Sequence, residues 1–112
     1  MLHGLQGSMT IQDQIRIREG LLAAAEQLHT NAGFVHGDIR DANVFIDTGN
    51  LGSLDPIKFH IIDFDWAGRV GEVAYPYDIN YLTVARPNCV VGGSRIETID
   101  DMLMIKEHLF PL

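Results

Sequence analysis

The sequence predicts an α+β fold in which a long helix, a small antiparallel β unit, a long loop and a closing helix follow one another. Three observations predict it. Apolar residues recur at helical spacing from residue 10 onward, short runs rich in β-branched and aromatic residues come next, and residues 66–97 show no period. With 112 residues, of which 46% are hydrophobic, the chain can bury the core of one domain. We therefore predict one domain over residues 10–112 after a short tail at residues 1–9.

The first helix is predicted to begin at Thr10. The pattern T-x-x-D from Thr10 to Asp13 is typical of a capping box, in which two side chains satisfy backbone amides that the start of a helix leaves free. The apolar positions that recur at helical spacing are Ile11, Ile15, Leu22, Ala25 and Leu28. Gly33 then offers a stop, which gives a helix of about five turns.

Three short apolar runs follow this helix and predict strands. They are F-V-H at 34–36, V-F-I at 44–46 and I-K-F-H-I-I-D-F at 57–64. The last two runs are separated by the turn-rich stretch T-G-N-L-G-S-L-D, so we predict that they form an antiparallel hairpin with a loose connection.

Residues 66–97 contain glycines and two prolines and have no hydrophobic period, so we predict a long irregular loop. Long loops in compact domains are usually functional or disordered. The closing helix is predicted to begin near Thr98, where T-I-D-D offers a second capping box. Its apolar positions are Met102, Ile105 and Leu109, and Pro111 ends it.

Composition excludes several classes of function. The net charge is -7, with only eight lysines and arginines, so we expect no nucleic-acid partner, because a phosphate-binding surface needs a basic stripe. Cys89 is the only cysteine, so no intrachain disulfide or cysteine-based zinc site can form, which fits a reducing compartment. The first residues have no basic signal region and no apolar run is long enough for a membrane span. We expect a soluble cytoplasmic protein with no membrane partner.

A cluster of ligand-like side chains separates the first two predicted strands. The stretch H-G-D-I-R-D-A-N, residues 36–43, contains H-x-D-x-x-x-x-N, with Asp38 and Asn43 five residues apart. Further along, the apolar run of the predicted hairpin ends in Asp63-Phe64. Aspartate and asparagine between strands are ordinarily turn formers. The second motif, in the same order and in a matching strand context, favours a functional interpretation instead.

The chain resembles the protein-kinase-like superfamily, most closely a fungal-type branch with H-G-D-[IL]-R-x-x-N, I-D-F-D-W-A-G and a following Y-P. The matching segments are His36–Asn43, Ile62–Gly68 and Tyr75-Pro76. The resemblance runs from about Ile11 to the C-terminus and covers only the catalytic half of a kinase. It implies the fold of a truncated kinase C-lobe, in which residues 66–97 form an activation-segment-like loop.

The resemblance implies an ATP-dependent phosphotransferase that moves the γ-phosphoryl group of ATP to a hydroxyl of a protein or a small molecule. Asp38 would accept or orient the proton of the attacking hydroxyl. Asn43 and Asp63 would hold Mg²⁺ across the nucleotide phosphates, since Mg²⁺ prefers few carboxylates together with phosphate oxygens. Arg40, two residues after Asp38, would grip the transferring phosphoryl group.

Other residues of the two motifs are expected to be structural. His36 would brace the loop by a side-chain hydrogen bond, and Phe64 and Asp65 would shape the segment after the strand. Asp65 stands where the family has the glycine of D-F-G, which adds a second carboxylate and restricts the flip that glycine permits. Gly37 replaces the arginine of H-R-D, so control by phosphorylation of residues 66–97 is not expected.

Three motifs of the family are absent from these 112 residues: the G-x-G-x-x-G loop, the V-A-I-K lysine and A-P-E. Each lost charge-assisted contact to phosphate is worth about 1.5 to 3 kcal/mol. We therefore expect this chain alone to bind ATP poorly, with a missing N-terminal lobe or a partner chain completing the nucleotide site.

Other interpretations stay open. The chain could be a catalytically silent lobe that serves as an interaction module, or a small-molecule phosphotransferase of the aminoglycoside type, which also uses H-G-D. Asp63 and Asp65 could form the D-x-D metal site of a glycosyltransferase, although the βα units that precede such a site are missing. Asp100 or Asp101 could bond amides of the 36–43 loop, as an aspartate does in kinases, while helix capping is the simpler account.

Overall fold

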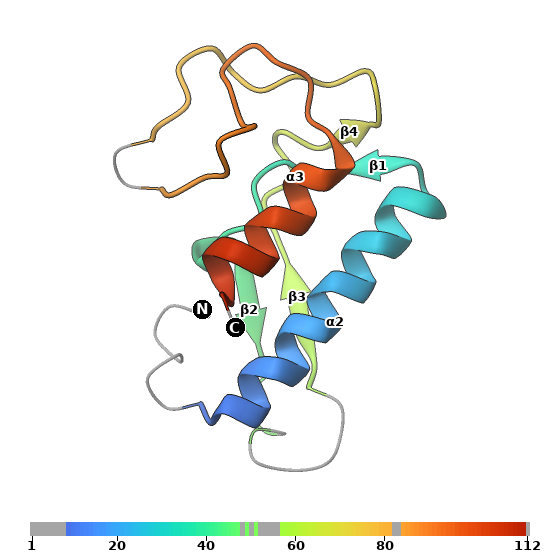
Figure 1. The fold of residues 1–112 in the computed structure, drawn as a ribbon. Coiled ribbons are helices and arrows are strands. Elements are labelled where there is room, and N and C mark those ends of the chain that lie inside the picture. The colour runs from blue at the N-terminus through green and yellow to red at the C-terminus, as the bar shows by residue number, and fades with distance from the viewer. Residues whose placement is uncertain (1–8, 48, 50, 52–56, 82–83, 112) are drawn as a thin grey trace.

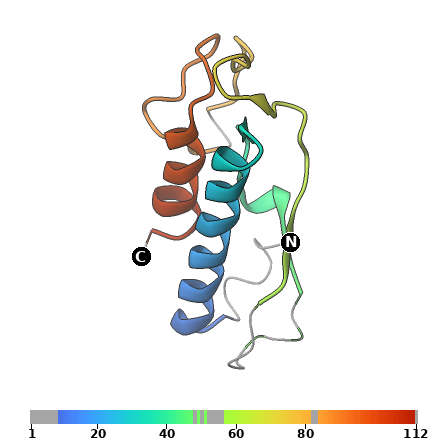
Figure 2. The same cartoon turned by 90° about the vertical axis from the view of Figure 1, so that its right-hand side faces the viewer.

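The computed structural model describes residues 9–47, 49, 51, 57–81 and 84–111. Two helices lie side by side in front of the strands (Figure 1), and a turned view shows the helices on one side and the strands on the other (Figure 2). The architecture is therefore α+β, as predicted. Residues 1–8 of the expected tail and most of the turn between the predicted hairpin strands lie outside the described residues.

The long helix α2, Ile11–Thr30, begins with the capping box that the sequence predicts. The Asp13 amide donates to the Thr10 hydroxyl at 3.1 Å, and the Thr10 amide donates to the Asp13 carboxylate at 3.4 Å. The buried face agrees with the expected one in part. Ala25 is buried and Leu22 packs against the core as the spacing predicts, whereas Ile11 is exposed in the first turn. The buried residues of the helix are Asp13, Ile17, Leu21 and Ala25.

The predicted hairpin is confirmed. Strand β2, Val44–Ile46, pairs antiparallel with β3, Phe59–Ile61, so that Val44 lies opposite Ile61 and Ile46 opposite Phe59. The first predicted strand is β1, Phe34–Val35, and its partner was not predicted. It pairs with β4, Gly68–Arg69, inside the segment that the sequence predicts as irregular loop.

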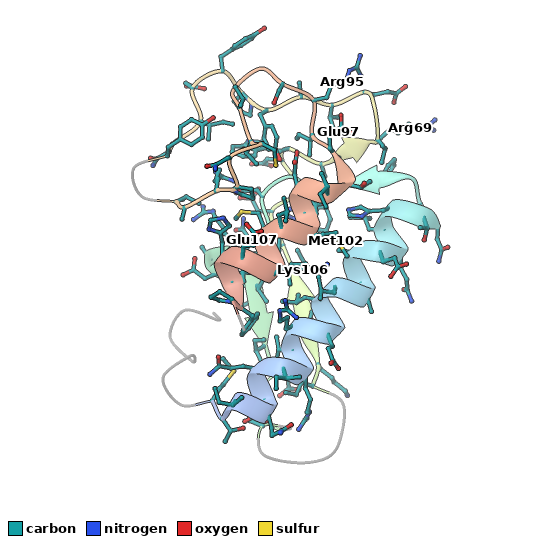
Figure 3. All side chains as sticks on the ribbon, viewed as in Figure 1. Arg69, Arg95, Glu97, Met102, Lys106 and Glu107 are labelled. Carbon is teal, nitrogen blue, oxygen red and sulfur yellow. The ribbon has the colours of Figure 1, made fainter. Side chains whose placement is uncertain are left out.

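The closing helix consists of α3, Thr98–Leu103, and a wider π-helical continuation, η4, over Met104–Leu109. Its capping box lies one residue earlier than predicted. The cap is Glu97, whose amide donates to Asp100 at 2.9 Å, and not Thr98 with Asp101. The reason is that the Asp101 carboxylate bonds outside its own helix, as described below. Lys106 and Glu107 lie on the exposed side of this helix (Figure 3).

Two hydrophobic clusters hold these elements together. The larger lies between α2, the β2–β3 hairpin and η4, and it includes Leu21, Val44 and Ile105, all fully buried. The smaller lies under the long loop and contains Val35, Tyr75, Ile79, Val90 and Ile96. The loop is thus largely irregular, as predicted, but it folds over a core of its own. None of the helices in the described ranges is both long enough and apolar enough to cross a membrane.

Candidate functional site

The loop His36–Asn43, here called the polar loop, is anchored by Asp101 of the closing helix. The two oxygens of this carboxylate accept the amides of His36 and Gly37, each at 2.8 Å. One of the oxygens also lies 2.8 Å from Nε2 of His29 on α2. Asp101 is 1% exposed, so these are buried, charge-assisted hydrogen bonds. Of the two aspartates weighed for this contact, Asp101 holds the loop and Asp100 caps the helix.

His36 joins the two halves of the candidate site. Its Nδ1 accepts the Asp38 amide at 3.0 Å, and its Nε2 lies 2.9 Å from the carbonyl oxygen of Ile62. An amide can only donate and a carbonyl can only accept, so the neutral ring with the proton on Nε2 satisfies both contacts. The Phe64 ring meets the His36 ring edge-on, with centroids 4.8 Å apart. The bracing role predicted for His36 matches this geometry.

The conformation and surroundings of Gly37 explain why this position holds a glycine. Its φ is +89°, a conformation that side-chain-bearing residues rarely adopt. A Cβ at this position would also lie 2.8 Å from the end of the Ile96 side chain and 3.4 Å from Cβ of Trp66. The polar loop therefore packs directly against the smaller hydrophobic cluster, and a residue with a side chain would be strained at this position.

Asn43 lies next to the aspartate of the first motif. Its side-chain nitrogen donates to the Asp38 backbone oxygen at 2.8 Å and to Asp38 Oδ2 at 3.2 Å. Both partners only accept, so the amide nitrogen must face Asp38 and the side-chain oxygen of Asn43 faces elsewhere. Asn43 is 4% and Asp38 8% exposed. The polar loop thus holds both predicted residues in a fixed orientation.

The segment Asp63–Asp65, here called the Asp63 segment, follows strand β3 and meets the polar loop at one point. The Ile62 amide donates to the Asn43 backbone oxygen at 2.9 Å. This bond brings the residue before Asp63 next to Asn43, the residue before β2. Asp63 has φ +61°, and its carboxylate accepts the Asp65 amide at 3.3 Å. All three residues of the segment are exposed. The Asp63 carboxylate is therefore open to a ligand.

The donor set suits magnesium with phosphate better than a protein-only metal cage. Within the described residues no three histidine, cysteine, aspartate or glutamate side chains gather closely enough to hold a metal. Asn43 and Asp63 offer one amide oxygen and one exposed carboxylate. Magnesium usually takes one or two protein oxygens and fills its other positions with water and phosphate. The two predicted ligands fit that pattern.

Two arginines reach the Asp38 carboxylate, and the sequence indicated only one of them. Arg40 Nε lies 3.5 Å from Asp38 Oδ1, while Nη2 of Arg86 donates to the same oxygen at 2.9 Å. The Arg86 side chain is 3% exposed, and its guanidinium carbon lies 4.9 Å from the centre of the Trp66 ring. Arg86 lies 48 residues after Asp38 in a segment without periodicity, so no local pattern signalled this contact.

Trp66 contacts two side chains of the long loop. Besides Arg86, it contacts Tyr75 edge-on at 6.0 Å between ring centroids. Together with Asp38, Arg40 and Arg86 it lines an open hollow of about 410 Å³. The remaining lining residues come from the long loop and are Pro76, Asp78, Ile79, Asn80 and Val84.

Asp100, the residue before Asp101, accepts hydrogen bonds from three donors in the long loop and at the start of the helix. Its carboxylate accepts the Glu97 amide, the Tyr75 hydroxyl at 3.0 Å and the Cys89 thiol at 3.0 Å. Burial, followed by the charge of Asp100, raises the pKa of Tyr75 far above its ordinary value. The hydrogen bond to Asp100, followed by burial, raises the pKa of Cys89 to about 11. The contacts from Tyr75 and Cys89 hold the long loop to the start of α3.

Comparisons of this chain with family models, with curated proteins and with solved structures found no match.

Proposed function

We propose that this chain is the catalytic lobe of an ATP-dependent phosphotransferase of the protein-kinase-like type, acting on a hydroxyl acceptor. One observation carries the proposal: the H-x-D-x-x-x-x-N loop and the D-F segment, 20 residues apart between Asn43 and Asp63, meet through the bond from the Ile62 amide to the Asn43 oxygen. Phosphoryl transfer depends on positioned charges more than on covalent chemistry, and this arrangement supplies them.

The proposed roles follow from the surroundings of each side chain. Asp38 is held by Asn43 and by backbone contacts of its own loop, so its carboxylate can orient an acceptor hydroxyl. The side-chain oxygen of Asn43 and the exposed carboxylate of Asp63 would be the ligands of Mg²⁺. Arg40 lies near enough to Asp38 to contact a phosphoryl group arriving there. Bound ATP and Mg²⁺ would supply the γ-phosphoryl group and neutralise its charge.

A second candidate is a catalytically silent lobe that serves as an interaction module. The observation that favours it is the contact between Arg86 and Asp38, 2.9 Å long and buried. An arginine on the proposed base competes with the acceptor hydroxyl for the same carboxylate. This candidate differs from the first in predicting no nucleotide binding that depends on Asp63.

The experiment that separates the two is calorimetric titration of the chain with ATP in the presence and absence of Mg²⁺. We expect Mg²⁺-dependent binding that Asp63→Ala loses and the matched control Asp65→Ala retains. A dissociation constant below about 1 mM would justify screening hydroxyl acceptors for phosphorylation. Binding that survives Asp63→Ala removes Asp63 from the metal role. No binding at all means that this chain does not form a nucleotide site without the missing N-terminal lobe or a partner chain.

A further inference from the structure

The hollow beside Asp38 is lined by arginines with buried nitrogens that make no hydrogen bond, here called free donors, although Arg40 Nε keeps its ion pair with Asp38 at 3.5 Å. Among the described residues, Nε and Nη1 of Arg86 and Nε of Arg40 are buried and make no hydrogen bond. The Arg86 side chain is 97% buried, since its exposed fraction is 3%. Buried polar groups in folded proteins are nearly always hydrogen-bonded, and an unpaired charged donor is among the most costly exceptions. Such donors indicate a ligand that supplies the missing acceptors.

Both arginines line the same hollow, whose volume of about 410 Å³ is large enough for a small molecule. Two carboxylates line it as well. Asp38 already pairs with Arg86 at 2.9 Å, and Asp78 is exposed to solvent. The Arg40 side chain is one-third exposed, so Arg86 is the buried guanidinium of the hollow. Asp38 takes only one of its nitrogens, and the two nitrogens without a hydrogen bond favour an anion that can accept from them.

The geometry of the free donors narrows the class of anion. A guanidinium group presents its N–H groups in a rigid plane that suits ligands with several oxygens, above all phosphate and carboxylate. Here the free donors come from two arginines on different segments, Arg40 on the polar loop and Arg86 on the long loop. A tetrahedral phosphate can accept from several directions at once, whereas a carboxylate has two oxygens in one plane.

We propose that Arg40 and Arg86 form a binding site for the phosphate group of a small phosphomonoester, beside Asp38. Phosphate binding at this site needs neither nucleotide nor magnesium, and it does not depend on the proposed transfer of the γ-phosphoryl group. Only the further step, that a hydroxyl acceptor would carry this phosphate, rests on the proposed function.

Trp66 makes the proposal directly measurable. It is the only tryptophan in the chain, and its ring lies 4.9 Å from the Arg86 guanidinium carbon. Fluorescence excited selectively at tryptophan therefore reports on this hollow. Inorganic phosphate is titrated at constant ionic strength without nucleotide or magnesium, beside a chloride series. We expect a saturable change with phosphate and none with chloride.

The variants distinguish a specific phosphate site at Arg40 and Arg86 from general attraction between phosphate and a charged surface. Arg86→Lys keeps the positive charge but removes the planar set of guanidinium N–H groups. Arg40→Gln removes the charge of the second arginine. Each is expected to weaken phosphate binding about tenfold or more. The matched control is Arg69→Gln, because Arg69 is exposed and points outward from β4 (Figure 3), and it should bind phosphate as the natural chain does.

The outcomes are separable from those of the nucleotide experiment. No saturable response in the natural chain, or equal affinity in Arg40→Gln, overturns the proposal whatever ATP does. If circular dichroism shows that Arg86→Lys does not fold, Arg40→Gln decides, since that side chain is one-third exposed and is not needed for the pair with Arg86. Glycerol phosphate compared with glycerol then tests the phosphomonoester class. Binding of free phosphate without binding of the ester contradicts that class.

Discussion

In the polar loop, His36, Asp38 and Asn43 are each more than nine-tenths buried and hydrogen-bonded, whereas the three residues of the Asp63 segment are all exposed. The two regions meet at one strand end. The polar loop is fixed by a helix and a hydrophobic core, whereas in the Asp63 segment the Asp63 carboxylate accepts the Asp65 amide at 3.3 Å and the Phe64 ring meets His36 edge-on. The difference in burial indicates that the two regions have different roles. The polar loop is rigid by its protein contacts, and the Asp63 carboxylate is left for a ligand to fix.

The largest effect is expected where the polar loop is anchored. Asp101→Ala removes the acceptor of two buried amides and the partner of His29, and leaves the amides unpaired. We expect the free energy of unfolding to fall by about 3 kcal/mol, measured by urea denaturation. The matched control is Asp65→Ala in the Asp63 segment, which should stay within about 0.5 kcal/mol of the natural chain. Equal losses in the two variants would contradict the contrast between the regions.

A smaller loss is expected from crowding the polar loop. Gly37→Ala places a methyl group 2.8 Å from the Ile96 side chain at φ +89°, and we expect the free energy of unfolding to fall by about 2 kcal/mol. Gly33→Ala separates the two causes. Gly33 also has a positive φ, +70°, but no atom lies within 4 Å of an added Cβ, so the loss should be about 1 kcal/mol. Identical losses would mean that packing against Ile96 contributes nothing.

The contacts that hold the long loop to the start of α3 should weaken at alkaline pH. Burial and Asp100 raise the pKa of Tyr75, so the folded chain keeps this proton at pH values where the unfolded chain releases it. The stability that this group contributes is complete below its unfolded pKa and is lost as the pH rises above it. The raised pKa of Cys89, about 11, acts in the same direction as the pH rises from about 9.

We therefore expect the free energy of unfolding to fall with a slope approaching 1.4 kcal/mol per pH unit for one group above pH about 10. Denaturation by urea at a series of pH values measures it. Tyr75→Phe removes the phenol and should flatten this slope, after a loss of about 1 kcal/mol at neutral pH for the hydrogen bond to Asp100. A variant whose alkaline slope equals that of the natural chain would exclude Tyr75 as its source.

The features of the fold that local sequence patterns determine were predicted. The capping box from Thr10 to Asp13, the pairing of 44–46 with the following strand, and the irregular character of residues 66–97 all depend on neighbours within a few residues or on simple alternation. The buried face of α2 was predicted in part. Ala25 is buried and Leu22 packs against the core, whereas Ile11 is exposed. The fully buried Ile17 and Leu21 were not among the predicted positions, because the elements that α2 packs against decide which of its apolar residues face inward.

The parts that could not be predicted depend on contacts across long separations. Arg86 reaches Asp38 over 48 residues and Asp101 reaches His36 over 65, and neither contact follows from the residues nearby. The motifs predicted one site containing Asp38, Asn43 and Asp63. In the structure Asn43 bonds Asp38, and the Asn43 backbone oxygen accepts the amide of Ile62, the residue before Asp63. The motifs could not show that Asp38 would be buried beside two arginines while Asp63 would be exposed.

The smallest effect on stability is expected at Asp63, and its sign is informative. Asp63→Gly relieves a positive φ of 61°, and this relief should slightly exceed the added entropy of the unfolded chain, raising the free energy of unfolding by about 0.5 kcal/mol. Asp65, which has no positive φ, is the control, and Asp65→Gly should lower it by about 0.5 kcal/mol. A fall in both variants would mean that Asp63 serves the fold. A rise at Asp63 alone means that folding does not explain an aspartate there, which leaves ligand binding as the reason for its carboxylate.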